Sequence, residues 1–180
     1  MRRDGIDLSN KIVYCIYEGN AELEILDILL DNKALIFSKD DLLDNKFHKR
    51  VSGKMLSEKL KFKFDKPIVI VRILDSKSEN LKLIKPYCEM YTDIINCYTC
   101  PEIEYLLILY HDDLKKYNKE GLKPSEFCKK YYDYSKNKDK AYFKSNYTVD
   151  EIILMLRKYH YQKKKHKLSI YSLLKDKRSC

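Results

Sequence analysis

The chain has no tryptophan, and none of its apolar runs approaches the ~20 residues that a membrane-spanning helix needs. Its N-terminal segment contains arginines but no long apolar stretch that ends in a small-residue cleavage site, so it does not match a secretory signal. Neither of the phosphate-binding patterns GxxxxGK[ST] and GxGxxG occurs, which argues against a P-loop ATPase or a dinucleotide enzyme. These absences predict a cytoplasmic protein that does not enter the membrane.

Cysteine is present but forms no dense framework. The six cysteines are scattered over 180 residues, as expected for reduced thiols in a cytosolic protein rather than for disulfides. Cys97 and Cys100 have the spacing of zinc ligands, but no second CxxC or paired histidine follows, and a zinc site needs about four ligands. We therefore interpret both as core or loop thiols.

Charge is divided unequally along the chain. With 44% hydrophobic and 35% charged residues the composition is globular, and the length fits one domain, or one domain with a helical appendage. Residues 1–112 hold 17 Lys and Arg against 19 Asp and Glu, a net charge of −2, whereas residues 113–180 hold 19 against 8, a net charge of +11. Such a block attracts polyanions. A solvated lysine-rich surface is the alternative.

Apolar periodicity predicts strands that alternate with helices over residues 1–112. We expect strands at 12–17 (IVYCIY), 34–37 (ALIF), 68–74 (IVIVRIL) and 93–96 (DIIN). We expect helices at 20–32, over most of 40–62, at 79–91, and at 101–111, which Pro101 opens. The pattern predicts an α/β fold: a three-layer, mostly parallel sheet of about four strands.

Residues 113–180 are predicted to form a basic helical extension that is rich in tyrosine and lysine. An amphipathic helix is expected at 149–161 and a short one at 169–176. Tyrosines interleaved with lysines at 129–147 could stack on bases while the lysines neutralise phosphates. Core packing or a partner interface is the alternative for these tyrosines.

Acidic residues follow two of the predicted strands. Glu18 and Asp75 each end an apolar run, and Glu22 and Glu79 come about one helical turn after them. Because sites in parallel sheets lie beyond the carboxyl ends of the strands, Glu18, Asp75 and Glu79 would converge if the first and third strands were neighbours. Such carboxylates could hold Mg²⁺ or Mn²⁺, and the alternative is that they cap helices and turns.

The strand–EGxxE–helix unit, followed by a strand, a helix and an apolar strand that ends in Asp75, resembles a toprim domain over about residues 11–112. The segment 100–111 (CPEIEYLLILYH) is similar to the N-P-x-F-E-x-W-L-L-x-H helix of RloB-like proteins, which are encoded near bacterial restriction and anti-phage loci.

This resemblance implies a role for each matched residue. Glu18 would be the general acid/base or a ligand, with Glu22 in support. Asp75 would be the main metal ligand, and Glu104 and His111 would match the family glutamate and histidine. The sequence departs from the toprim Asp-x-Asp pattern, because Lys77 stands at the second acid. Either Glu79 substitutes for that acid, or metal binding is weakened or lost.

The resemblance and the charge distribution together lead to three hypotheses. The first is a metal-dependent nuclease that cuts RNA or DNA in anti-phage defence. The second is a catalytically silent nucleic-acid-binding module, in which Lys77 contacts phosphate. The third is an interaction subunit, or oligomer, that docks on an ATPase or another defence partner. The predicted nucleic-acid contacts are Lys77, Lys129, Lys130, Tyr132, Lys163, Lys164 and Lys165.

Overall fold

Four parallel strands form the centre of the protein. The structure is a computed structural model that describes residues 5–50, 52–60, 64–75, 91–134, 141–162 and 168–176. The strands lie in the order β2-β1-β3-β4, and every neighbouring pair is parallel. Their bounds are β1 Ile12–Tyr17, β2 His48–Lys49, β3 Ile68–Leu74 and β4 Tyr91–Tyr98.

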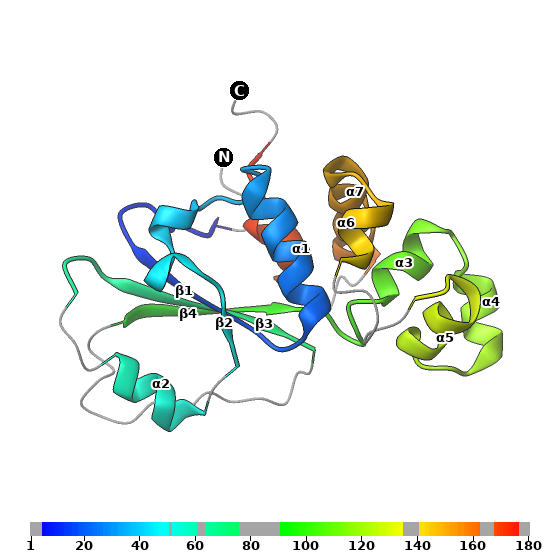
Figure 1. Ribbon diagram of the computed structural model, residues 1–180, viewed down its shortest axis with the longest axis horizontal. Coiled ribbons are helices and arrows are strands. Elements are labelled where there is room, and N and C mark those ends of the chain that lie inside the picture. The colour runs from blue at the N-terminus through cyan, green and yellow to red at the C-terminus, as the bar shows by residue number, and fades with distance from the viewer. Residues whose placement is uncertain are drawn as a thin grey trace.

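Helices lie on both faces of this sheet, as Figure 1 shows. The α-helices of the described part are α1 Asn20–Asp31, α2 Gly53–Lys59, α3 Tyr105–Tyr110, α4 Leu114–Glu120, α5 Pro124–Tyr131, α6 Tyr142–Asn146 and α7 Val149–Gln162. Three 3-10 turns also occur, at η2 Lys39–Asp41, η3 Leu43–Asn45 and η5 Ile170–Leu173. Helix α1 covers one face and α2 the other. The predicted α/β class with a parallel sheet of about four strands is confirmed.

The alternation of side chains along the buried strands produces two separate apolar clusters. Val13 and Cys15 of β1 point into the large cluster on the α1 face, whereas Tyr14 and Ile16 point into the smaller cluster on the α2 face. Every residue of β3 is buried. A strand that is covered on both faces reads as a continuous apolar run, which is why IVIVRIL was recognisable in the sequence.

Several predicted elements match the structure closely. The strands at 12–17 and 68–74 have the expected bounds, and the fourth strand is longer than expected, at Tyr91–Tyr98. The helix expected at 20–32 is α1, and the amphipathic helix expected at 149–161 is α7. The short helix near the C-terminus is the 3-10 turn η5. The helix expected at 79–91 lies outside the described residues, except that Tyr91 begins β4.

The prediction of a strand at 34–37 was wrong. Leu35 and Phe37 are buried, but the backbone forms only an isolated antiparallel bridge between Leu35 and Leu174. The amide of Ile36 donates to the Leu173 carbonyl at 2.9 Å. A four-residue apolar run records burial, and it does not reveal which backbone partner satisfies its hydrogen bonds.

Two helix predictions also needed correction. Residues 40–50 contain 3-10 turns and the two-residue strand β2, and the α-helix of this region is limited to Gly53–Lys59, where Ser52 accepts a hydrogen bond from the Met55 amide at 3.3 Å. The helix expected to open at Pro101 begins at Tyr105. Tight turns precede it, with the Tyr105 amide bonded to the Glu102 carbonyl at 3.1 Å.

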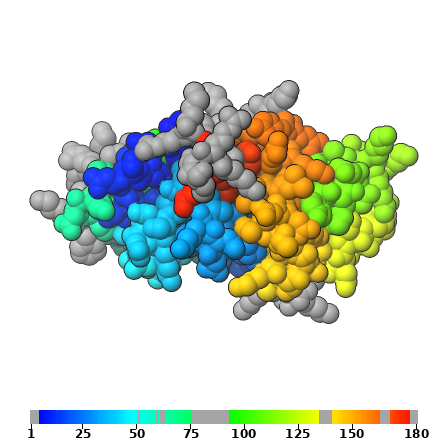
Figure 2. Space-filling model, turned by 90° about the horizontal axis from the view of Figure 1, so that it is seen from above, coloured from blue at the N-terminus to red at the C-terminus, as the bar shows by residue number. Residues whose placement is uncertain are grey.

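The basic second part of the chain shares its core with the sheet. Phe127, Phe143, Ile152 and Ile170 are buried in the same cluster as Val13 and the other α1-facing strand residues. Seen from above, α6 and α7 lie directly against α1 (Figure 2). Within the described part of the chain, no helix is both long and apolar enough to cross a membrane.

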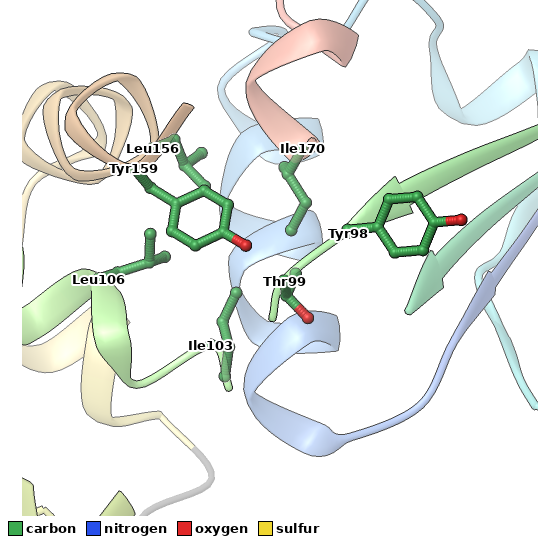
Figure 3. A pocket seen from close by; sticks show the side chains of 7 residues that line it. All are labelled: Tyr98, Thr99, Ile103, Leu106, Leu156, Tyr159 and Ile170. Carbon is green, nitrogen blue, oxygen red and sulfur yellow. The ribbon is translucent and has the colours of Figure 1, made fainter. Parts of the chain in front are cut away.

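A small apolar cavity marks the junction of the sheet with these helices (Figure 3). Its volume is about 10 Å³, room for roughly one water molecule, so it is too small to hold a nucleotide. Its lining residues come from the end of β4 and from α3, α7 and η5: Tyr98, Thr99, Ile103, Leu106, Leu156, Tyr159 and Ile170.

Candidate functional site at the carboxyl edge of the sheet

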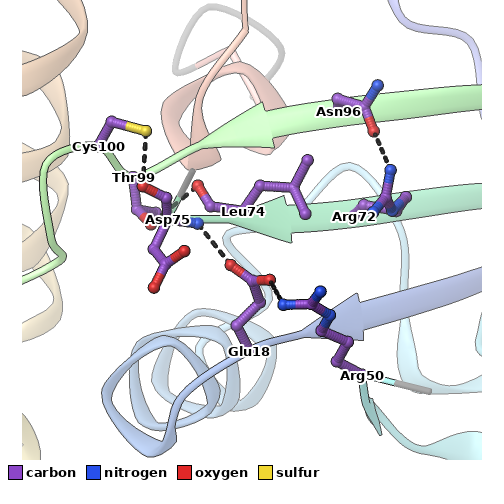
Figure 4. A network of polar contacts seen from close by, with 8 residues as sticks. All are labelled: Glu18, Arg50, Arg72, Leu74, Asp75, Asn96, Thr99 and Cys100. Atoms are coloured by element: carbon purple, nitrogen blue, oxygen red, sulfur yellow. Dashed lines mark hydrogen bonds and ion pairs between the residues drawn. The ribbon is translucent and has the colours of Figure 1, made fainter. Parts of the chain in front are cut away.

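The carboxyl ends of all four strands present polar groups along one edge, as Figure 4 shows. Arg50 follows β2, Glu18 follows β1, Asp75 follows β3, and Cys100 lies two residues beyond β4. Because β1 and β3 are direct neighbours, Glu18 and Asp75 come together, as the sequence predicted on the condition of that pairing. This edge is the candidate functional site.

Both carboxyl oxygens of Glu18 accept hydrogen bonds. Oε2 accepts from the backbone amide of Asp75 at 2.7 Å, and Oε1 accepts from Nη1 of Arg50 at 2.8 Å. The Glu18 side chain is only 9% exposed, whereas the Arg50 side chain is 52% exposed. Glu18 is therefore held on one side by rigid strand backbone and on the other by a side chain that reaches into solvent.

Backbone contacts from the end of β4 fix the Asp75 turn. The amide of Thr99 donates to the Leu74 carbonyl at 2.8 Å, and the Thr99 hydroxyl donates to the same oxygen at 3.2 Å. The thiol of Cys100 donates to the Asp75 carbonyl at 2.7 Å. Cys100 thus supports the backbone at the candidate site, whereas Cys97 is buried inside the sheet.

The environment of Glu18 raises the pKa of its carboxyl group. Burial is the largest cause, and the neighbouring Asp75 carboxyl group acts in the same direction. The Asp75 amide and the Arg50 guanidinium oppose this shift without cancelling it. Two neighbouring carboxyl groups of this kind favour a shared proton or a shared cation.

This raised pKa predicts how stability depends on pH. Below the ordinary pKa of 4.5 the carboxyl is protonated whether the chain is folded or not. Above pH 4.5 the carboxyl ionises more easily in the unfolded chain than in the folded protein, so the free energy of unfolding falls until the pH passes the higher pKa of the folded state. We expect wild type to lose stability relative to Glu18→Gln between pH 4 and pH 8 in urea unfolding. An increase in the stability of wild type relative to Glu18→Gln would show that Arg50 and the Asp75 amide lower the Glu18 pKa by more than burial raises it.

The pair of carboxyl groups fits a hard divalent ion. Magnesium and manganese prefer oxygen ligands, and Mg²⁺ is commonly held by one or two carboxylates together with substrate phosphate. Asp75 would provide one such carboxylate, and Glu18 would act beside it as a second ligand or as the general acid/base. Among the described residues no group of three or more His, Cys, Asp or Glu side chains gathers in a metal-binding arrangement. Glu79, the predicted third ligand, lies outside the described part, as does Lys77.

Glu22 lies behind this edge, in the first turn of α1, and is buried. A Cβ atom added to Gly19 would stand 2.5 Å from Glu22 Oε2, so the absence of a side chain at Gly19 lets the Glu22 carboxyl fold back against the turn. A side chain at position 19 would push the Glu22 carboxyl away from this turn.

Glu104 lies in the helical core and not at the sheet edge. It is 1% exposed and lies near Tyr134, whose pKa is raised by burial first and then by the charge of Glu104. The charges of Glu24 and Glu22 of α1 act in the same direction, so Tyr134 also lies near α1. A carboxyl this deeply enclosed joins helices and does not reach a substrate in the described structure.

His111 and Tyr132 belong to a group of packed aromatic rings at the end of α3. The two ring centroids are 4.6 Å apart with the ring planes tilted by 34°, and His111 Nε2 lies 3.2 Å from the Tyr147 hydroxyl. The Tyr132 hydroxyl donates to Asp113 at 2.8 Å. The face of Tyr132 is thus occupied by His111, which favours the packing interpretation of this tyrosine over base stacking.

Two of the predicted lysine contacts belong to the described part of the chain. Lys129 and Lys130 are exposed in the last turn of α5, and Lys130 forms an ion pair of 2.7 Å with Glu120. Lys163, Lys164 and Lys165 lie outside the described residues.

Sequence reasoning missed Arg50, which forms an ion pair with Glu18. Arg50 was predicted to be part of a helix, because the strand β2 that precedes it contains only two residues and shows no apolar alternation. The edge position of Arg50 follows only from the pairing of Ile16 with His48 and of Tyr17 with Lys49.

Comparison with known protein families, with curated proteins and with solved structures finds no match to this chain.

Proposed function

We propose that this protein hydrolyses phosphodiester bonds of nucleic acid at the carboxyl edge of its sheet, with the help of Mg²⁺ or Mn²⁺. The observation that carries the proposal is the Glu18–Asp75 carboxyl pair at the ends of two adjacent parallel strands. In parallel sheets, sites lie in this position. The pair also occupies the positions at which the chain resembles toprim domains, a family placement that belongs to this proposal.

The proposed chemistry assigns different roles to the two acids. A divalent ion bound there supplies charge neutralisation of the phosphate and orientation of the attacking water. Glu18 holds or transfers a proton at Oε1, because Oε2 is fixed by the Asp75 amide. Its raised pKa brings the proton affinity closer to neutral pH, where general acid–base catalysis is most effective. Asp75 provides the exposed carboxylate beside it.

The charge distribution supports a polyanionic substrate. The segment 113–180 has a net charge of +11, and its helices α4 and α5 lie beyond the carboxyl ends of the strands (Figure 1). A nucleic acid that approaches the edge would therefore meet the more basic part of the chain. Electrostatic attraction of this kind accelerates encounter and weakens as salt is added.

Metal titration tests the site directly. We expect Mn²⁺ to bind wild type in calorimetry and to bind Asp75→Asn at least about tenfold more weakly, because half of the carboxylate pair is lost. Glu58→Gln removes an exposed carboxylate from α2 and is the control, with an affinity equal to that of wild type. Equal Mn²⁺ affinity in Asp75→Asn and wild type would contradict the proposal.

A catalytically silent nucleic-acid-binding module is the second candidate. It is favoured by the hydrogen bonds that already engage both oxygens of Glu18, and by Lys77 at the second acid of the toprim pattern. Such a module would bind oligonucleotides in a salt-sensitive manner, equally well with and without a chelator, and would release no cleavage product. An anti-phage role, with an ATPase or another defence protein as partner, is an extension of either candidate.

A further inference from the structure

Arg50 forms an ion pair with Glu18 that a negatively charged substrate could break. The guanidinium engages Oε1 at 2.8 Å, and Oε2 is engaged by a backbone amide that cannot leave without moving β3. Oε1 is the oxygen assigned above to proton transfer. The free protein therefore has its reactive oxygen covered by a side chain, and only that side chain can move away while the sheet stays intact.

The exposure of the two partners is unequal. Arg50 is 52% exposed and Glu18 is 9% exposed, so an approaching anion meets the guanidinium before it meets the carboxylate. The backbone of Arg50 is fixed, because its amide donates to the Tyr17 carbonyl at 2.8 Å. Rotation of the side chain can therefore take the guanidinium away from Glu18 without a movement of the backbone.

Phosphate is a suitable competitor for this guanidinium. The planar fork of arginine donates two parallel hydrogen bonds to phosphate oxygens as well as to carboxylates. Glu18 is only 9% exposed, so separation of the pair costs its carboxylate one charge-assisted hydrogen bond, and the exchange requires that the guanidinium gains a phosphate in return.

We propose that Arg50 is a latch on Glu18 that a nucleic-acid phosphodiester opens by taking over the guanidinium, which frees Glu18 Oε1 only when substrate is bound. The inference rests on the proposed function for its substrate class, but it does not need cleavage to occur. It makes Arg50 a positioning residue that couples substrate binding to the release of the acid.

A double-mutant cycle on oligonucleotide binding tests the latch. Binding of a fluorescent single-stranded oligonucleotide is measured in excess chelator, so that neither metal nor hydrolysis contributes. We expect Arg50→Gln to weaken binding about tenfold, because a charge-assisted contact to phosphate is lost. Glu18→Gln should strengthen binding about two- to fivefold, because Arg50 no longer has to leave an ion pair.

The combination of the two substitutions is decisive. If Arg50 acts as the latch, Glu18→Gln should not increase oligonucleotide affinity in a protein that already carries Arg50→Gln, because no guanidinium remains to be released. Simple repulsion between Glu18 and the oligonucleotide would give the same gain in both backgrounds, and that additive result overturns the proposal. So does an Arg50→Gln variant that binds as tightly as wild type.

Matched variants separate the latch from general charge effects. Lys49→Gln removes an exposed positive charge from the neighbouring position of β2, and the Glu18→Gln gain should persist in that background. If Glu18→Gln does not fold, Glu18→Asp takes its place, since it shortens the reach to Arg50 while it keeps the charge. Because the cycle is measured without metal, a protein that never cleaves nucleic acid can still pass or fail it.

Discussion

Replacement of Glu18 by Gln, or of Asp75 by Asn, is expected to reduce the cleavage rate of an oligonucleotide by about 100- to 10,000-fold, the range by which a positioned acid or base contributes. Both changes are nearly isosteric, and Gln at position 18 can still accept the 2.7 Å hydrogen bond from the Asp75 amide. The measurement is single-turnover cleavage of labelled RNA and DNA with Mn²⁺, with circular dichroism to confirm folding.

The same assay contains its own control. Glu58→Gln removes a carboxylate from an exposed position of α2 and should leave the rate unchanged. Full activity in both Glu18→Gln and Asp75→Asn would exclude the carboxyl edge as the catalytic site. Absence of cleavage by wild type, together with chelator-insensitive binding, would select the silent module.

The second large effect concerns the junction between the sheet and the back half of the chain. Leu156 of α7 is 2% exposed and lines the small cavity between the end of β4 and helices α3 and α7. We expect Leu156→Ala to lower the free energy of unfolding by about 2–5 kcal/mol, since it removes buried methyl groups and enlarges a cavity that already exists. Urea unfolding followed by far-ultraviolet dichroism measures this loss.

Leu154 offers a matched comparison on the same helix. It is 42% exposed, so Leu154→Ala should change the free energy of unfolding by no more than about 0.5 kcal/mol. We also expect a single transition in both variants, because residues of α7 and residues of β1 belong to one apolar cluster. A Leu156→Ala protein in which α7 unfolds while the sheet remains would show that the back half is an independent unit.

The predictions from sequence succeeded where local signals and burial coincide. The apolar runs at 12–17 and 68–74 form buried strands, and the turn glycine at position 19 lies where EGxxE places it. They failed at 34–37, where an apolar run is buried without joining the sheet. They failed again at β2, where two residues join the sheet without an apolar pattern. Apolar character reports burial, while strand pairing depends on partners distant in the chain.

The residues of the candidate site also differ in whether a local sequence signal identified them. Glu18 and Asp75 were identifiable because each one ends an apolar strand, whereas Glu104 matched a family motif and lies enclosed beside Tyr134. Arg50 had no sequence signal. Its position depends on the parallel pairing of β2 with β1, and it contacts a residue 32 positions away in the chain.

The sequence by itself determined the α/β class, the acids that end β1 and β3, and the concentration of positive charge in residues 113–180. These properties depend only on local composition and on the short-range periodicity of apolar residues. Only the tertiary structure decided that β1 and β3 are neighbours, that Arg50 covers Glu18, and that α6 and α7 pack against α1. The physical reason is that strand order and helix docking come from the burial of apolar faces between segments far apart in the chain, and local pattern does not encode which segments meet.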